Sequence, residues 1–134
     1  MQDEEEPREI TELLAKLVRE PLIAFPPPGE RLEASDRKGV YVIYSPQDKV
    51  VHVGSTPRAK EGVAQRLRNH LDGKSSFTKS QFAGDGSRLR RGYKFRYLVV
   101  DNGRQRALLE ALGIGQLCPE HIGHGLDASE PDSK

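Results

Sequence analysis

A β-hairpin signal is the feature of this sequence that most limits its fold. In the stretch KGVYVIYSPQDKVVHVG, residues 38–54, two runs of β-branched and aromatic residues flank a polar turn. Alternating runs of this kind on either side of a turn are typical of antiparallel strands, which we expect over residues 40–44 and 50–53. Each strand also carries a polar ring, Tyr41 and His52, where Val or Ile would pack equally well.

Segments with helical periodicity precede and follow the hairpin in the sequence. Five apolar residues share one helical stripe and predict a helix from about Glu6 to Arg19: Ile10, Leu13, Leu14, Leu17 and Val18. The following segment, residues 24–32, contains three consecutive prolines. Because proline neither continues a helix nor donates to a sheet, this segment should be a stiff connector. After the hairpin, apolar residues at helical spacing indicate a second helix over residues 59–71.

The residue pattern of the second half of the chain predicts a loop, a strand and a helix. Residues 73–92 are rich in Ser, Gly, Lys and Arg, which indicates a long loop with a short helical turn near residues 78–82. Residues 93–101 alternate and then become apolar, as in a third strand. Residues 103–117 have the strongest helical pattern, with five residues expected to face inward: Ala107, Leu108, Ala111, Leu112 and Ile114.

The predicted elements follow one another in the order α–β–β–α–loop–β–α. A chain of 134 residues is enough for one domain with a modest core. We divide it into an accessory helix and Pro-rich connector (1–37), a globular domain (38–125) and an acidic tail (126–134), whose composition is typical of disorder.

Composition excludes several classes of protein. No apolar run approaches the ~18 residues that a membrane span needs, and the acidic start MQDEEEPRE is the opposite of a secretory signal. The single cysteine, Cys118, cannot form an internal disulfide, which favours a reducing, cytoplasmic environment. Because Cys118 lies at the end of a predicted helix, we expect its thiol to be buried rather than nucleophilic.

The net charge of +1 conceals a strong segregation of charge. Residues 38–106 hold fifteen basic and five acidic side chains, whereas the flanking segments 1–37 and 107–134 carry net charges of −5 and −4. A basic middle between acidic ends is either a face for a polyanion such as nucleic acid or an ordinary solvated Lys/Arg surface. Charge alone does not decide between these two interpretations.

Five polar residues are not required by packing: Tyr41, His52, Arg66, His70 and Glu110. The two hairpin rings can meet if they share a face, and Arg66 and His70 are neighbours one helical turn apart. Glu110 interrupts the most apolar helix, so it lies either on the exposed side or inward for metal or base chemistry. Taken singly, each residue also has an ordinary role as a packing tyrosine, a surface histidine or a solubilising arginine.

In their order along the chain, these residues form a more specific pattern. The segments GVY (39–41) and HVG (52–54), the spacing Arg-x3-His (66–70) and the helix RALLEALGIGQLCP (106–119) resemble the GIY-YIG nuclease family. The resemblance extends over residues 38–124. It implies a small α/β (α+β) domain with a three-stranded, mainly antiparallel sheet flanked by helices. It also implies the hydrolysis of nucleic-acid phosphodiesters with one divalent metal ion, Mg²⁺ or Mn²⁺.

The resemblance also implies roles for individual residues. Tyr41 matches the tyrosine that activates or orients the attacking water, and Arg66 the arginine that stabilises the scissile phosphate. His70 matches a histidine of the restriction-enzyme members, and Glu110 matches the metal-binding glutamate. These types suit the chemistry, because a guanidinium and a cation stabilise charge on phosphoryl oxygens and Mg²⁺ needs only one or two carboxylates. Tyrosine, with a pKa near 10, becomes a base at neutral pH only if nearby cations lower that pKa; Arg66, His70 and the metal would be their source.

Two positions depart from the family pattern. His52 stands where the family has its second tyrosine, which leaves open how Tyr41 and His52 share the acid–base work. Ile122 stands in a P-x-x-N context where the family often has asparagine. Either His121 or His124 takes over the role of that asparagine, or the role is dispensable. We expect both histidines to be surface residues in a glycine-rich turn.

The sequence therefore predicts a metal-dependent endonuclease acting on DNA, with RNA as a second possible substrate. Predicted phosphate contacts come from basic residues of the second helix and the long loop: Arg68, Lys74, Lys79, Arg88, Arg90 and Arg91. The alternative is a catalytically weak or inactive nucleic-acid-binding module of the same fold. No membrane partner is expected, whereas the leucine stripe of the first helix could hold a homodimer or a partner protein.

Overall fold

The computed structural model describes residues 2–56 and 62–122, with side chains from residue 4 onward. The expected acidic tail (126–134) and His124 lie outside these described residues. The elements follow in the order α1 (Gln2–Leu17), β1 (Ile23–Ala24), β2 (Gly39–Tyr44), β3 (Val50–Ser55), α2 (Val63–Leu71), α3 (Ser76–Phe82), a 3₁₀ helix (Gly86–Arg90), β4 (Lys94–Val99) and α4 (Gly103–Leu117).

The strands form one antiparallel sheet in the order β1-β4-β2-β3. The predicted mixed fold with a mainly antiparallel sheet is confirmed, and the three predicted strands are its core. The fourth strand, β1, was not predicted. Its two residues pair with β4, Ile23 opposite Phe95 and Ala24 opposite Lys94, and a pair of residues is too short to show any alternation.

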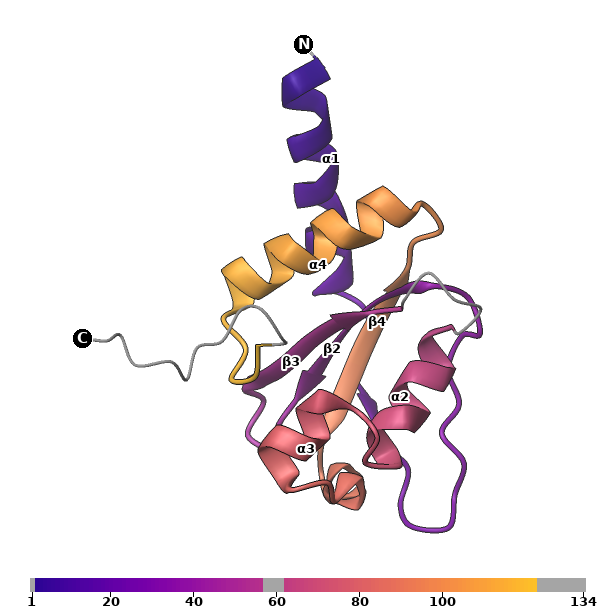
Figure 1. The fold of residues 1–134 in the computed structure, drawn as a ribbon. Coiled ribbons are helices and arrows are strands. Elements are labelled where there is room, and N and C mark those ends of the chain that lie inside the picture. The colour runs from indigo at the N-terminus through magenta and orange to yellow at the C-terminus, as the bar shows by residue number, and fades with distance from the viewer. Residues whose placement is uncertain (1, 57–61, 123–134) are drawn as a thin grey trace, which may run out of the picture.

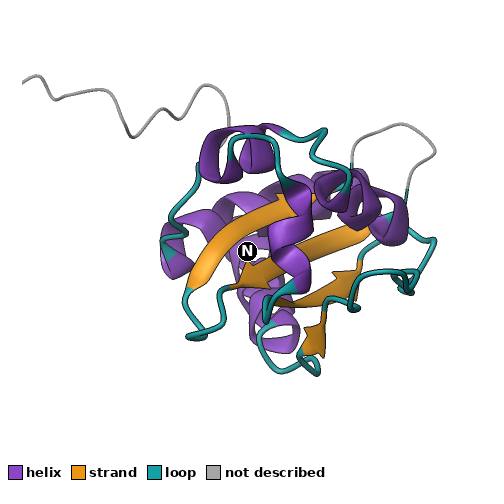
Figure 2. Cartoon of the chain, turned by 90° about the horizontal axis from the view of Figure 1, so that it is seen from below, coloured by secondary structure: helices purple, strands orange, loops and turns teal. Residues whose placement is uncertain are grey.

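Helices cover both faces of the sheet. α1 and α4 lie on one side of the strands, and α2 and α3 lie on the other (Figure 1). Seen from below, the strands fan across the molecule between the two helical layers (Figure 2). Side chains alternate along β2, so Tyr41 and Ile43 belong to the core under α2 and α3, whereas Val40 and Val42 belong to the core under α1 and α4.

α1 packs its predicted stripe against α4 within the same chain. Ile10 and Leu17 are buried and Leu13 and Leu14 partly buried in the core that also contains Leu109. The helix begins at Gln2 and includes Pro7, four residues earlier than expected. In the described part of the chain, no helix combines the length and apolar character that crossing a bilayer requires.

α4 has its predicted bounds, and its packed face agrees in part with the expected one. Leu108, Leu112 and Ile114 are partly buried against the core as expected, whereas Ala107 and Ala111 are exposed. The buried residues are Arg106, Leu109 and Gly113. A Cβ at Gly113 would lie 3.3 Å from Val53 Cγ1, which is a tight contact. The helix therefore approaches β3 closely along its 109–113 face. Cys118, expected to be buried, is exposed at the end of the helix.

The expected loop at 73–92 is mostly helical. Ser75 caps α3 by accepting a hydrogen bond from the Thr78 N–H, and Ala83 ends the helix with a left-handed conformation at φ 54°. A 3₁₀ helix follows directly. Arg90 then donates hydrogen bonds to the carbonyls of Pro26, Pro27 and Glu30 at 2.9–3.1 Å. The polar composition of this segment thus serves capping and tethering rather than flexibility.

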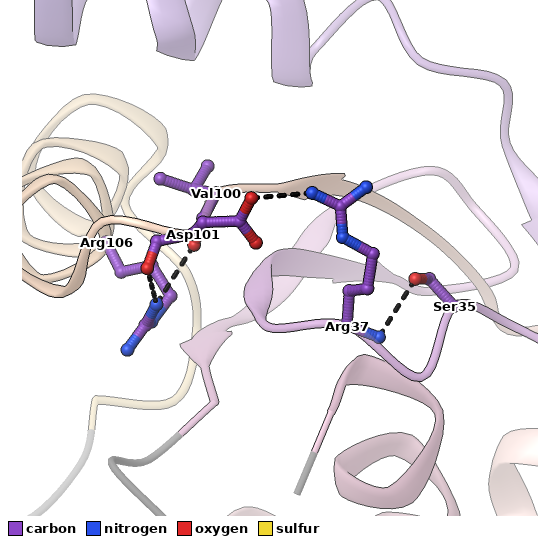
Figure 3. A network of polar contacts seen from close by, with 5 residues as sticks. All are labelled: Ser35, Arg37, Val100, Asp101 and Arg106. Atoms are coloured by element: carbon purple, nitrogen blue, oxygen red, sulfur yellow. Dashed lines mark hydrogen bonds and ion pairs between the residues drawn. The ribbon is translucent and has the colours of Figure 1, made fainter. Parts of the chain in front are cut away.

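A polar network fixes the start of α4. The buried guanidinium of Arg106 donates to the carbonyl oxygens of Val100 and Asp101 at 3.0 and 2.8 Å, as Figure 3 shows. The Asp101 carboxylate in turn pairs with Arg37 at 2.6 Å, and the Arg37 N–H donates to Ser35 Oγ. Residues 106 and 110 are one helical turn apart. The network therefore anchors α4 just ahead of Glu110.

Candidate active site

Tyr41 and His52 lie on the same face of the hairpin, as required for a shared site. Tyr41 pairs with Gly54 and His52 with Ile43, and the register then shifts so that Tyr44 pairs with Val50. This irregularity is a β-bulge at Val51, a device that re-aims neighbouring side chains. The two rings have centroids 6.0 Å apart.

Gly54 leaves the space in which the two polar rings meet. A Cβ at this position would lie 2.5 Å from Tyr41 Oη and 3.0 Å from His52 Nε2. The phenolic oxygen and this ring nitrogen are therefore both close to the Gly54 backbone. The glycine of the HVG segment is needed for this close approach rather than for a special backbone conformation.

α2 contributes His70, which bonds directly to Tyr41. Tyr41 Oη and His70 Nε2 are 2.7 Å apart, and His70 Nδ1 lies 2.6 Å from Ser75 Oγ. All three side chains are buried. The predicted tyrosine and histidine thus form one hydrogen-bonded chain that ends on the N-cap serine of α3.

The donors in this chain can be assigned from its far end. The Thr78 hydroxyl donates to the Ser75 carbonyl oxygen, so the Ser75 hydroxyl is left to donate to Thr78 Oγ1 at 3.1 Å. Ser75 Oγ then accepts from His70 Nδ1–H, which leaves His70 Nε2 unprotonated. Tyr41 therefore donates its hydroxyl proton to His70.

Burial determines the protonation states in this cluster. Burial, reinforced by Arg66 and His121, lowers the pKa of His70 to about 3. Burial holds the pKa of His52 well below its ordinary value, and the electrostatic influence of His70, His121 and Arg66 adds to this lowering. For Tyr41, burial raises the pKa to about 12 although Arg66 acts in the opposite direction. The expected lowering of the tyrosine pKa by Arg66 and His70 is thus outweighed by burial, which also keeps His70 neutral.

Because His52 and His70 are buried and neutral, we expect the protein to lose stability in mild acid. Below pH ~6.5 an imidazole in the unfolded chain takes up a proton, whereas folded His70 resists protonation down to about pH 3. Below pH ~6.5 the unfolded state therefore binds more protons than the folded state. The free energy of unfolding consequently decreases as the pH is lowered, by roughly 2 kcal/mol per histidine between pH 7 and pH 5. Urea unfolding at pH 7, 6 and 5 measures this, and His70→Asn should flatten the slope. A free energy of unfolding that is constant over this window would contradict the buried, neutral histidines.

Arg66 brings an unsatisfied donor to the site. It lies one turn before His70 on α2, and its charge acts on Tyr41, His52 and His70. Its Nε is buried and has no hydrogen-bond partner among the described residues. A buried donor without an acceptor is costly. An anionic oxygen bound in the site would satisfy it.

Glu110 reaches the site from the opposite helical layer. Its half-buried carboxylate accepts a hydrogen bond from Ser55 Oγ, at the end of β3, with 2.7 Å between Oγ and Oε1. Its charge raises the pKa of Tyr41, the smallest of the effects on that residue. Because β3 is the edge strand of the sheet, a side chain from α4 can approach groups that belong to the other face.

The Glu110 carboxylate suits Mg²⁺, which can bind through a single protein carboxylate. Residues 2–56 and 62–122 contain no group of three or more His, Cys, Asp or Glu side chains arranged to hold a metal ion. Mg²⁺ commonly keeps several waters and binds through one or two carboxylates and substrate phosphate oxygens. The Glu110 carboxylate, oriented by Ser55, matches that requirement.

His121 corrects one expectation from the sequence. It is buried, with 7% of its surface exposed, and its Nδ1 lies 3.1 Å from His52 Nδ1. Its backbone N–H donates to the Val51 carbonyl oxygen, so the segment after α4 runs beside β3. The expectation of a surface histidine was wrong because pairing across the edge strand cannot be read from a glycine-rich turn. Phe77 of α3 stacks on His52 with the ring centroids 4.7 Å apart.

The predicted nucleic-acid contacts divide into two groups. Lys74, Lys79, Arg88 and Arg91 are exposed around α3 and the 3₁₀ helix, with Arg88 stacked over the Phe82 ring. By contrast, Arg68 donates twice to the Leu32 carbonyl oxygen, and Arg90 donates to the Pro-rich connector as described above. These last two guanidinium groups hold the connector in place.

Sequence reasoning missed four residues that shape the site: Ser55, Ser75, Phe77 and His121. Ser55 directly follows the HVG segment. Ser75 could have been recognised as a helix N-cap, because serine is a preferred residue at that position. Phe77 lies in the segment expected to be a loop, so no helical face was assigned to it. His121 has no local signal, because its position depends on contacts with β3.

Comparisons with known proteins identify the family and the fold of this chain. A family model described as the GIY-YIG catalytic domain matches residues 37–120, and no curated protein sequence matches the chain. Among solved structures, the chain is similar to the magnesium-bound GIY-YIG N-terminal endonuclease domain of UvrC from Thermotoga maritima, with 24% identity, coverage of 69% of this chain and 90% of that chain, and a TM-score of 0.50. It is also similar to a mutant of EndoII from bacteriophage T4, with 17% identity, coverage of 85% and 98%, and a TM-score of 0.51.

The two structural likenesses are distant in sequence, and they establish a shared fold. The family match covers most of the chain and includes the segments that carry Tyr41, His52, Arg66, His70 and Glu110. The predicted resemblance is therefore confirmed. The chain belongs to the GIY-YIG catalytic-domain family, a family of divalent-metal-dependent nucleases.

Proposed function

We propose that this protein is an endonuclease that hydrolyses DNA phosphodiester bonds with Mg²⁺, for which Mn²⁺ can substitute. One observation supports this most strongly: the charges of Arg66 and Glu110, which come from helices on opposite sides of the sheet, both act on Tyr41, and Arg66 Nε is a buried donor without a partner among the described residues. Tyr41, Arg66 and Glu110 supply a proton acceptor, an anion ligand and a metal ligand. The related UvrC domain binds magnesium as its catalytic divalent cation.

The proton relay explains how Tyr41 works despite its high pKa. A free tyrosinate would be costly in this buried site, where the pKa is about 12. If Tyr41 accepts a proton from the attacking water while passing its own to His70 Nε2, 2.7 Å away, no tyrosinate accumulates. The water oxygen forms the new bond to phosphorus, the bond to the leaving ester oxygen breaks, and that oxygen takes a proton from solvent. Because the pKa of His70 is about 3, the proton on Nε2 returns to Tyr41, which releases to solvent the proton that it took from the water, and both side chains regain their neutral state.

The other two groups stabilise the developing charge. Arg66 Nε–H donates to a non-bridging phosphate oxygen, which satisfies its buried donor. Glu110 would hold the Mg²⁺ ion, and Ser55 orients its carboxylate. When bound, Mg²⁺ supplies Lewis-acid stabilisation of the phosphoryl oxygens.

DNA lies across the exposed basic residues Lys74, Lys79, Arg88 and Arg91 in this proposal. Contacts of this kind go to phosphates, so they give affinity that depends on salt and little sequence preference. Residues 38–125 form the catalytic unit. The single cysteine favours the cytoplasm as its compartment. A dimer or partner protein would have to use the outer side of α1, because its apolar stripe packs on α4.

A second candidate is a nucleic-acid-binding module without catalytic activity. His52 in place of the second tyrosine and Ile122 in place of the asparagine favour it. The relay from Tyr41 to Ser75 opposes it, because binding alone does not require a buried proton acceptor behind the tyrosine.

Plasmid cleavage with Arg66→Ala separates the two candidates. Wild-type protein should convert supercoiled plasmid to nicked or linear DNA with Mg²⁺ and not with EDTA. Arg66→Ala should lower the rate ~10²–10³-fold, the typical cost of removing one charge-stabilising donor. Arg8→Ala, which removes an exposed arginine of α1, is the matched control. Salt-sensitive DNA binding without cleavage by the wild type would identify the binding module instead, and branched DNA and RNA substrates define the preferred class.

A further inference from the structure

The ring that replaces the family's second tyrosine is held by another histidine. His52 and His121 are 9% and 7% exposed, and their Nδ1 atoms are 3.1 Å apart. The ring centroids are 5.1 Å apart, so the two Nδ1 atoms face each other across a hydrogen bond. Phe77 stacks on the His52 ring at an interplanar angle of 18° and prevents it from tilting away.

One of the two Nδ1 atoms must donate, and the surroundings of His52 decide which. The other end of the His52 ring, Nε2, lies beside Gly54 and the Tyr41 hydroxyl, where the positive charge of Arg66 acts on both rings. A neutral imidazole turns its lone pair rather than an N–H toward a cation. The proton therefore belongs on His52 Nδ1, where His121 Nδ1 is the acceptor.

We propose that His121 is a positioning residue: by accepting the hydrogen bond from His52 Nδ1, it fixes His52 in the tautomer that presents an unprotonated Nε2 to the catalytic site. This rests on the proposed nuclease function, and it assigns His52 the role of a second acceptor beside Tyr41. The attacking water can then donate one hydrogen to Tyr41 Oη and the other to His52 Nε2. Two acceptors fix its orientation better than one.

Main-chain hydrogen bonds of the segment after α4 fix the position of His121 beside β3. The Glu120 and His121 N–H groups donate to the Val50 and Val51 carbonyl oxygens at 3.3 and 3.0 Å. These bonds extend the edge of β3 directly beside the bulge that aims His52. The position of His121 is therefore set by main-chain contacts and not by its own side chain, so substitution of that side chain should leave the segment in place.

Two substitutions of matched shape test the proposal. His121→Asn keeps an acceptor oxygen at the place of Nδ1, whereas His121→Leu puts a methyl group there. Long-range ¹H–¹⁵N correlation spectra at pH 7.5 report the tautomer of His52 directly. We expect protonated Nδ1 and unprotonated Nε2 in the wild type and in His121→Asn, and a shift toward protonated Nε2 in His121→Leu. Plasmid cleavage should show kcat ~10–100-fold lower in His121→Leu, the usual cost of losing a partner behind an active group, with KM for DNA unchanged and partial recovery in His121→Asn.

The spectra separate failure of this inference from failure of the nuclease proposal. The wild-type spectrum alone overturns the inference if His52 carries its proton on Nε2, whether or not the protein cuts DNA. An unchanged His52 tautomer in His121→Leu also overturns it. If the tautomers behave as expected but the wild type does not cleave, the positioning of His52 stands and the proposed activity fails. If His121→Leu is unfolded, the wild-type and His121→Asn spectra still decide.

Discussion

Glu110→Gln is expected to lower Mg²⁺-dependent cleavage by ~10³-fold or more while leaving DNA binding intact. The substitution keeps the shape of the side chain and an oxygen that can still accept from Ser55 Oγ, but it removes the negative charge. A neutral amide is a poor ligand for a hard divalent cation. Loss of one charge-stabilising group alone typically costs ~10²–10³ in rate, and here the bound cation is lost with it.

Three measurements check this prediction on the same protein. Plasmid cleavage gives the rate, Mn²⁺ titration followed by electron paramagnetic resonance gives metal affinity, and fluorescence anisotropy gives DNA affinity. Glu120→Gln removes the same charge from an exposed residue ten positions along the chain and should change none of them. Cleavage by Glu110→Gln within a few fold of wild type would remove Glu110 from the metal site. Lost cleavage with retained Mn²⁺ affinity would make it an electrostatic group rather than a ligand.

The sequence predicted the elements whose pattern is local. The hairpin and α4 were placed because alternation and helical periodicity each extend over several residues. The face of α4 was predicted only in part: Leu108, Leu112 and Ile114 pack on the core as expected, whereas Ala107 and Ala111 are exposed. Apolar residues occur on several sides of this helix, so its periodicity alone does not select one face. The segment 73–92 was expected to be a loop because its composition is polar. Its helix α3 instead depends on the caps at Ser75 and Ala83, which composition does not reveal.

The candidate site divides in the same way. Tyr41, Arg66, His70 and Glu110 could be proposed as site residues because their order and spacing form a gapped pattern that is visible in the sequence. Their partners were not identified, because Ser55 and Ser75 become partners of Glu110 and His70 only after the helices pack on the sheet. The protonation states were also unpredictable. They follow from burial, which gives His70 a pKa of about 3 and Tyr41 a pKa of about 12.

Tyr41→Phe should lower the cleavage rate ~10²–10⁴-fold, the range for loss of a positioned proton-transfer group, without weakening DNA binding. Phenylalanine fills the same buried space but cannot relay a proton to His70. It also leaves the buried His70 Nε2 without a partner, so we expect a loss of ~1–3 kcal/mol in the free energy of unfolding. Rates of plasmid cleavage and urea unfolding measure the two effects separately.

Tyr44→Phe is the matched control, because Tyr44 lies on the same strand with its ring in the core of the opposite face. This substitution should change the cleavage rate by no more than a few fold. The relay and a site centred on His52 make different predictions for Tyr41→Phe. If Tyr41→Phe cuts DNA at nearly the wild-type rate while His52→Phe does not, the water is activated by His52 Nε2 and Tyr41 serves only to pack against His70. If both substitutions abolish cleavage, both acceptors beside Gly54 are needed, which is the result expected when they orient the same water.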